Sequence, residues 1–196
     1  MTHARLNKKQ DILQAATLLF AEQGFHATTT IQISKVAGIT EPMIYYHFQG
    51  KNELFTSIIA STFERFFAYL EDLPENTDTE FEKIENLIDL HFDIVKKMPH
   101  EIYLAVSTCP ARLEDPDGIC HKNIREIRRR LKKYLTECLE AGMAAGEFNT
   151  VAVDPTVNLI GTMLTGLMRQ RGLKFEEVKG LREVTVEFCR RSLVKP

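Results

Sequence analysis

An all-α protein of about nine helices is the fold class that the sequence predicts, and three observations indicate it. Apolar residues recur three and four positions apart along most of the chain, which is the spacing of an amphipathic helix. Glycine and proline are sparse, with 10 and 7 of 196 residues, whereas loop-rich β proteins need more turn residues. No segment alternates apolar and polar side chains as a half-buried strand would.

Composition and charge resemble those of an ordinary globular protein. The hydrophobic share is 44% and the charged share 27%, which excludes disordered and collagen-like chains. Uncharged runs stay below the roughly 18 residues of a membrane span, and the N-terminus lacks the apolar stretch of a signal peptide. We therefore expect a cytoplasmic protein without a membrane partner. The net charge of −2 favours no nucleic-acid partner, so such a function must come from a local arrangement.

Cap residues place the first two helices. Asn7 and Gln10 resemble a capping box that opens a first helix, and Gly24 ends it. Thr30 is the expected N-cap of a second helix of barely two turns, which Gly38 stops.

A third short helix follows almost at once. Thr40 is its expected N-cap, Glu41 and Pro42 suit its first turn, and it continues through Tyr45 to Phe48. One residue lies between the glycine stop and this N-cap, so the second and third helices cannot lie antiparallel. The pattern predicts a helix-turn-helix motif.

Six further helices complete the predicted chain. They are a helix from Gly50 to just before Pro74, one opened by a capping box at Thr79 and Glu82, a short one near Glu101–Cys109, a long one over Ile119–Met143, one begun by Asp154 and Pro155, and a last one over about residues 176–193.

The helix that begins at Asp154 is unusual, because residues 156–168, TVNLIGTMLTGLM, carry no charge. A helix that is apolar on all sides lies in a large core or between its own core and a second subunit. We expect a four-helix interface between two copies of the chain, and an intramolecular core helix is the alternative. The predicted interface residues are Leu159, Ile160, Met163, Leu164, Leu167, Val184 and Phe188.

The four cysteines are Cys109, Cys120, Cys138 and Cys189, and they form neither a C-x-x-C pair nor a zinc-binding spacing. We expect no metal site and reduced, mostly buried thiols. A thiol-based redox sensor is the alternative, because cytosolic thiols that lie close together in a fold can couple.

The segment ILQAATLLFAEQGFHATTTIQISKVAGITEPMIYYHFQGKNELF, residues 12–55, carries the most specific pattern in the chain. It resembles the DNA-binding domain of the tetracycline-repressor (TetR) family of bacterial transcription regulators. Ser34 stands where the family usually has alanine, and Glu41 puts an acid where DNA should approach. The resemblance implies a helix-turn-helix DNA-binding domain over residues 1–52 and a ligand-binding and dimerisation domain over residues 53–196.

The resemblance also implies which residues contact DNA. The third helix would enter the major groove, with Glu41 and Met43 among the side chains at base edges and Tyr46 among the phosphate donors. Alternatively, Tyr45 is a core aromatic, as we expect Phe48 to be. The predicted DNA-binding residues are Thr30, Thr40, Glu41, Pro42, Met43, Tyr45, Tyr46, His47 and Lys51.

The charge of the predicted DNA-binding domain affects how strongly it can bind DNA. Residues 1–55 hold one more basic than acidic residue, so a single such domain neutralises few phosphates and binds weakly. We therefore expect a homodimer on a palindromic operator in double-stranded DNA. A second basic run, over residues 122–133, follows one arc of its helix and predicts a solvated face; a patch for an anionic effector or an acidic partner is the alternative.

Members of the family commonly bind a small molecule in the C-terminal domain. This implies a ligand-responsive regulator, most simply a repressor that an unknown small molecule releases from DNA by moving the fourth helix. Each candidate lining residue is otherwise a plain core residue, and His91 a satisfied core histidine. The candidates are Phe63, Phe67, Ile88, His91, Phe92, Tyr103, Tyr134 and Met163.

Motifs for catalysis are lacking. The sequence contains no H-E-x-x-H, no glycine-rich phosphate loop and no nucleophile elbow. We therefore expect neither an enzyme nor a cofactor, and a helical adaptor that acts through protein partners is the rival function.

Overall fold

The computed structural model describes residues 2–109, 115, 117–172 and 178–196, without the side chains of residues 2–7 and 171–172. These residues form nine α-helices and one π-helical turn, so the predicted all-α fold class is confirmed. Within the described residues, Phe148 and Val194 form an isolated antiparallel β-bridge. Each described helix is too short or too polar to cross a lipid bilayer.

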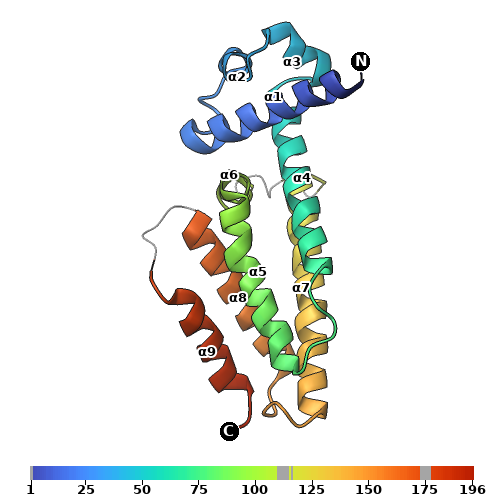
Figure 1. Cartoon of the computed structure of the whole chain (residues 1–196), viewed down its shortest axis with the longest axis vertical. Coiled ribbons are helices and arrows are strands. Elements are labelled where there is room, and N and C mark those ends of the chain that lie inside the picture. Colours follow the sequence, from blue (N-terminus) through green and yellow to red (C-terminus); the bar gives the residue numbers. More distant parts are fainter. Residues whose placement is uncertain (1, 110–114, 116, 173–177) are drawn as a thin grey trace.

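A small head of three helices forms one end of the molecule (Figure 1). It consists of α1 (Thr2–Gln23), α2 (Thr30–Val36) and α3 (Glu41–His47). The N-cap of α2 is Thr29, so the predicted N-cap at Thr30 is wrong by one residue. Gln32 explains the shift. Its backbone N–H donates to the Thr29 hydroxyl, and its side-chain oxygen accepts from the Thr29 backbone N–H at 2.8 Å, which completes a capping box.

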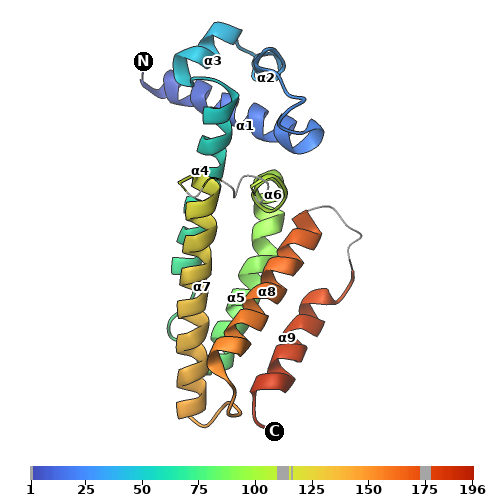
Figure 2. The same ribbon diagram turned by 180° about the vertical axis from the view of Figure 1, so that it is seen from behind.

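Longer helices form the body below the head. They are α4 (Lys51–Glu71), α5 (Glu80–Lys97), α6 (Pro99–Tyr103), the π turn η1 (Leu104–Thr108), α7 (Ile119–Ala144), α8 (Val153–Gly172) and α9 (Leu181–Leu193). In Figures 1 and 2, α9 lies beside α8 at the edge of the body away from α4. The expected start of the last helix near residue 176 lies outside the described residues.

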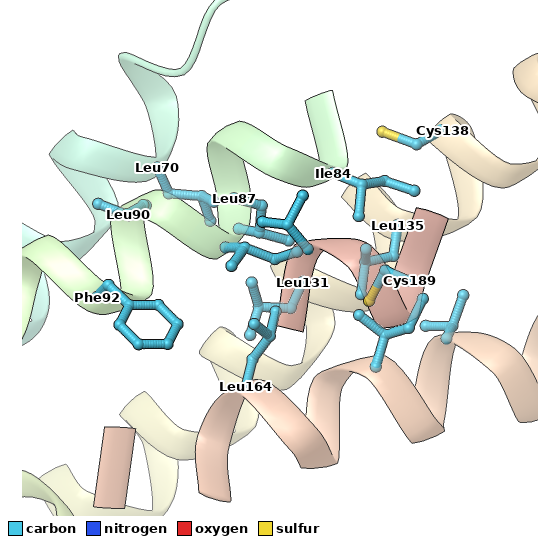
Figure 3. Packing of buried hydrophobic residues seen from close by; sticks show 14 of the residues in the cluster. Leu70, Ile84, Leu87, Leu90, Phe92, Leu131, Leu135, Cys138, Leu164 and Cys189 are labelled. Atoms are coloured by element: carbon cyan, nitrogen blue, oxygen red, sulfur yellow. The ribbon is translucent and has the colours of Figure 1, made fainter. Parts of the chain in front are cut away.

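The core of the body forms where α5, α7, α8 and α9 meet (Figure 3). Leu87 of α5 packs in one cluster with Leu131 and Leu135 of α7, Leu164 of α8 and Cys189 of α9. All five side chains are at most 5% exposed. This packing of apolar helix faces gives the body its stability.

A second apolar cluster, the head cluster, joins the head to the body through α4. Leu54 and Phe63 of α4 pack in it with residues of α1, α2 and α3, whereas Phe66 and Leu70 of the same helix pack in the body core. The predicted domain boundary between residues 52 and 53 therefore falls inside a continuous helix that belongs to both parts.

Cys109 and Cys120 form a disulfide bond. The prediction of four reduced thiols is therefore wrong for this pair, because the fold brings the end of η1 to the first turn of α7, with 5.4 Å between the two Cα atoms. Cys138 and Cys189 are free and buried as expected. Burial disfavours their thiolates and raises the pKa of Cys138 to about 12 and that of Cys189 to about 11.

Candidate nucleic-acid interface

Helix α3 is anchored on one face and exposed on the other. Ile44 and Phe48, one turn apart, are 0% and 2% exposed and belong to the head cluster. Met43, Tyr45 and Tyr46 are 38%, 56% and 61% exposed. The alternative that Tyr45 is a core aromatic is therefore wrong, while the expectation for Phe48 is confirmed.

A polar network joins α2 to α3. The Thr30 hydroxyl donates to the Glu41 carboxylate at 2.6 Å and lies 3.3 Å from the Tyr45 hydroxyl. Glu41, the acidic residue that departs from the family pattern, is thus held by a hydrogen bond from α2. This contact fixes the start of α3 relative to α2.

Lys51, at the start of α4, is used inside the head. Its ammonium group donates to the carbonyl oxygens of Thr28 and Phe25, at 2.7 and 2.9 Å, and lies 4.8 Å from the centre of the Phe25 ring. These contacts tie α4 to the loop between α1 and α2. Sequence spacing gives no signal for this role, because the partners lie 23 and 26 residues away. The expected phosphate contact of Lys51 stays a prediction.

The other predicted DNA-binding residues lie on α3 or directly before it. Thr40 is exposed and is the N-cap of α3, although its side chain makes no capping hydrogen bond. Pro42 is exposed in the first turn, and the ring of the half-buried His47 lies edge-on to Tyr46, with centroids 5.0 Å apart. The expected set is thus gathered on one element, apart from Thr30 and Lys51, which adjoin it.

A second exposed apolar surface lies on α8 and α9, and we call Leu159, Val184 and Phe188 the α8/α9 face. Their side chains are 63%, 65% and 56% exposed. A Cβ atom added to Gly161 or Gly166 of α8 would meet nothing within 4 Å, so space around both is open. This part of the predicted interface is available to a partner.

The rest of the predicted interface lies partly in the core of the chain itself. Ile160 and Leu164 are 5% and 0% exposed in the body core, so placing them at a dimer interface is wrong. The helix period explains this burial. It turns Ile160 and Leu164 toward the body core, while Leu159 points outward. Met163 and Leu167 are half-buried and pack at the edge of the same core.

The predicted ligand-lining residues do not gather around one cavity. Phe63 lies in the head cluster and Tyr103 packs against it, whereas Ile88 and Phe92 belong to the body core. The others pack against the body core or lie within it; they are Phe67, His91, Tyr134 and Met163. In this conformation all eight contribute to packing, and their contact with a ligand stays a prediction.

His91 is the polar group inside this packing. It is 2% exposed, its Nδ1 lies 2.8 Å from the Leu87 carbonyl oxygen, and its ring meets that of Phe66 at 5.8 Å. Burial disfavours the charged imidazolium and lowers the pKa to about 4, although the hydrogen bond to Leu87 acts in the opposite direction. His91 is therefore neutral at ordinary pH.

A cleft of about 220 Å³ lies between α1, α4 and α6. Gln14, Arg65, His100 and Glu101 are among its lining residues, and an Arg65 guanidinium nitrogen lies 3.6 Å from a Glu101 carboxylate oxygen. None of the predicted ligand residues lines this cleft. Sequence reasoning missed it because its walls come from three separate elements.

The basic run on α7 is a solvated face, as predicted. Arg129 and Arg130 both donate to Glu126, and these hydrogen bonds lower the Glu126 pKa to about 2. Lys132 pairs with Asp154 at 2.9 Å, and most of the run is exposed.

Known proteins resemble this chain in both sequence and fold. The family model described as "Bacterial regulatory proteins, tetR family" matches residues 12–58. The HTH-type transcriptional repressor KstR2 of Mycobacterium tuberculosis is 22% identical over 142 residues, which are 72% of this chain and 70% of that protein. The fatty acid metabolism regulator protein of Bacillus subtilis is 26% identical over 140 residues, 71% of this chain and 70% of that protein.

Solved structures extend the likeness over nearly the whole chain. The ketosteroid transcriptional regulator KstR2 of M. tuberculosis has a TM-score of 0.74 at 20% identity and covers 95% of both chains. FadR of B. subtilis, solved in complex with stearoyl-CoA, has a TM-score of 0.67 at 21% identity and covers 92% of this chain and 96% of that one. With the head matched in sequence and the full length matched in fold, the chain belongs to the TetR family of helix-turn-helix, DNA-binding transcription regulators.

Proposed function

We propose that this protein is a ligand-responsive repressor, which binds a palindromic operator as a homodimer and leaves it when a small molecule enters the body. The observation that carries the proposal is the exposure of Met43, Tyr45 and Tyr46 above the buried Ile44 and Phe48. The methionine offers apolar contact to thymine methyl groups, and the two phenol hydroxyls offer hydrogen bonds to bases or phosphates. Such side chains on the second helix of a helix-turn-helix suit the major groove.

The α8/α9 face supports the dimer. Three large apolar side chains stay more than half exposed there, and an exposed apolar patch of this kind marks an interaction surface. A second copy of the chain is the partner that the DNA contact requires, since one head carries little positive charge. Arg182 of α9, which forms a two-pronged pair with Asp89 of α5, holds the face in place on the body.

For the effector we infer a molecule with a long apolar portion, such as an acyl thioester. The B. subtilis relative was solved with stearoyl-CoA, and the body core of this chain is a cluster of mostly aliphatic and aromatic side chains. A ligand in this core must separate α5 from α7 and α8, because Ile88 and Phe92 are packed there. It weakens DNA binding only by preferring the separated state.

Fluorescence anisotropy with labelled DNA from upstream of the protein's own gene tests the DNA contact. Tyr46→Ala should weaken specific binding about tenfold or more, and Tyr46→Phe should show how much of the loss belongs to the hydroxyl. Lys96→Ala, at an exposed position of α5, is the control and should bind as the wild type does. Equal binding by Tyr46→Ala would contradict the proposal.

Dimerisation and release need separate measurements. Phe188→Glu should yield monomers in sedimentation-velocity ultracentrifugation, whereas Lys122→Ala, an exposed change on α7, should leave the dimer intact. Stearoyl-CoA should release the wild type from DNA while coenzyme A alone should not. Unchanged DNA binding in stearoyl-CoA would reject this effector class.

A further inference from the structure

The disulfide between Cys109 and Cys120 lies at the junction of head and body. Cys109 directly follows η1, and Cys120 lies in the first turn of α7. The two residues are 0% and 2% exposed, and both belong to the head cluster together with Leu104 of η1 and Ile58 of α4. A covalent bond thus joins two body elements inside the cluster on which the head rests.

The π turn depends on the same cysteine. The Cys109 N–H donates to the Leu104 carbonyl oxygen at 3.0 Å, five residues back, and this bond closes the π turn. Such turns are rare and hold one residue more than an α turn, so they redirect the residues that follow. Here the residue that closes the turn is also the one that is bonded to α7.

Helix α6, which leads into η1, contacts the head. Glu101 of α6 pairs with Arg65 of α4, and His100 and Glu101 share the cleft with Gln14 of α1. Leu104 is fully buried in the head cluster. A change in η1 must therefore alter the surface against which α1 and α4 pack.

We propose that Cys109 and Cys120 are a reversible thiol–disulfide switch that controls the position of the head. In the disulfide form, the bond holds η1 in its π turn and α6 against α1 and α4. Reduction frees Cys109 from α7, which lets η1 return to an α-type turn and shifts α6 against the head. Because the DNA contact rests on the head, the two forms differ in DNA affinity; this last step rests on the proposed function.

The chemistry needs a dithiol reductant and a peroxide. One thiolate of the dithiol attacks a sulfur of the Cys109–Cys120 bond, and the mixed disulfide is resolved by the second thiolate of the dithiol. Two cysteine thiols and the oxidised dithiol result. In the reverse direction, one cysteine thiolate attacks hydrogen peroxide, and the O–O bond breaks to give a sulfenic acid and water. The other cysteine then displaces water, so that two thiols and one peroxide become one disulfide and two waters.

The remaining two cysteines serve as internal controls. Cys138 and Cys189 lie in the body core, apart from the head cluster, and burial raises the pKa of each thiol. Both are free thiols, whereas Cys109 and Cys120 are bonded to each other, so neither Cys138 nor Cys189 takes part in the proposed exchange. A Cys138→Ala, Cys189→Ala double variant should therefore keep the redox response, whereas Cys109→Ala should abolish it.

Thiol counting and hydrogen exchange on the full-length protein test the switch without DNA. After peroxide treatment, alkylation of the unfolded wild type should modify two of the four cysteines, and after dithiothreitol all four. Backbone amides of residues 100–109 should exchange about tenfold faster or more in the reduced protein, because the π turn opens more often. Four free thiols after peroxide, or equal exchange in both forms, would overturn the proposal.

Anisotropy on the same operator DNA then tests the consequence for the head. The reduced and oxidised wild type should differ about fivefold or more in Kd, and Cys109→Ala should show no difference. If that variant does not fold, Cys120→Ser removes the same bond from the other side and should likewise show no difference. Equal affinity in both forms overturns the switch, whereas absence of DNA binding in both forms counts against the proposed function and leaves the thiol and exchange results to decide.

Discussion

Replacing Lys51 by methionine tests whether this lysine holds the head together or contacts DNA. In the structure its ammonium group donates to the Thr28 and Phe25 carbonyls at 2.7 and 2.9 Å and lies over the Phe25 ring. Methionine keeps an apolar stem of similar length but removes the donors and the charge. The loop between α1 and α2 then loses its connection to α4.

The expected cost follows from these contacts. A hydrogen bond to a charged group contributes about 1.5–3 kcal/mol, and an exposed cation–π contact about 0.5–1 kcal/mol. Lys51 and its acceptors are only partly buried, so water replaces much of what is lost. A net decrease of about 2 kcal/mol in the free energy of unfolding is reasonable, which for a chain of this size lowers Tm by about 4–8 °C.

Thermal unfolding followed by circular dichroism measures this shift. Lys35→Met is the matched control, since Lys35 is exposed on α2 and its loss removes the same charge from the same head. Its free energy of unfolding should change by less than about 0.5 kcal/mol. An unchanged Tm in Lys51→Met, together with weakened DNA binding, would refute the structural role and favour a direct phosphate contact.

Three further predictions concern the body. Gly142→Ala places a methyl group against the buried ring of Phe148 and should lower the free energy of unfolding, measured in urea, by about 1–3 kcal/mol. The control Gly161→Ala lies in open space and should cause no measurable loss. The folded-state pKa of His91, about 4, lies below its unfolded value of 6.5, so the unfolded chain binds the extra proton as the pH falls. Through this residue, the free energy of unfolding should therefore drop by about 2 kcal/mol between pH 7 and pH 5. Urea titrations at both pH values should show a smaller drop for His91→Gln than for the wild type, and equal drops in the two proteins would contradict this explanation. Glu147 accepts the N–H groups of Glu80 and Phe81 at the start of α5, so Glu147→Ala should cost about 1–2 kcal/mol, and calorimetry should find Glu147→Gln less damaging.

Local patterns predicted helix α3 well. Phe48 was expected in the core and Tyr46 at the surface, and the structure buries Phe48 together with Ile44 while it exposes Tyr45 and Tyr46. Helix limits were also close, because caps and glycine stops act within a few residues. Thr29 replaced Thr30 as the N-cap of α2 since Gln32 completes a capping box with the earlier threonine.

Contacts between distant segments left no such pattern. The bond between Cys109 and Cys120 depends on how η1 meets α7, and cysteine spacing cannot reveal this. Helix α8 shows a different limit. Because its residues 156–168 are uncharged, the sequence lacks the polar contrast that tells the inner face from the outer one, and only packing separates the buried Ile160 from the exposed Leu159.

The division of α4 between two clusters gives the proposed regulation a physical route from the body to the head. One continuous helix from Lys51 to Glu71 is fixed to the head loop at its first residue and to the body core through Phe66 and Leu70. Its 21 residues span about 30 Å, so a tilt of only about six degrees at the body end moves the head end by about 3 Å. In the proposed dimer, two heads displaced in opposite senses would change their separation by about 6 Å, which is nearly two base-pair steps and would spoil the match to half-sites one helical turn apart. Under either proposal, a ligand in the core or opening of the disulfide, a small rearrangement beside α4 would therefore suffice to change DNA binding without unfolding either part.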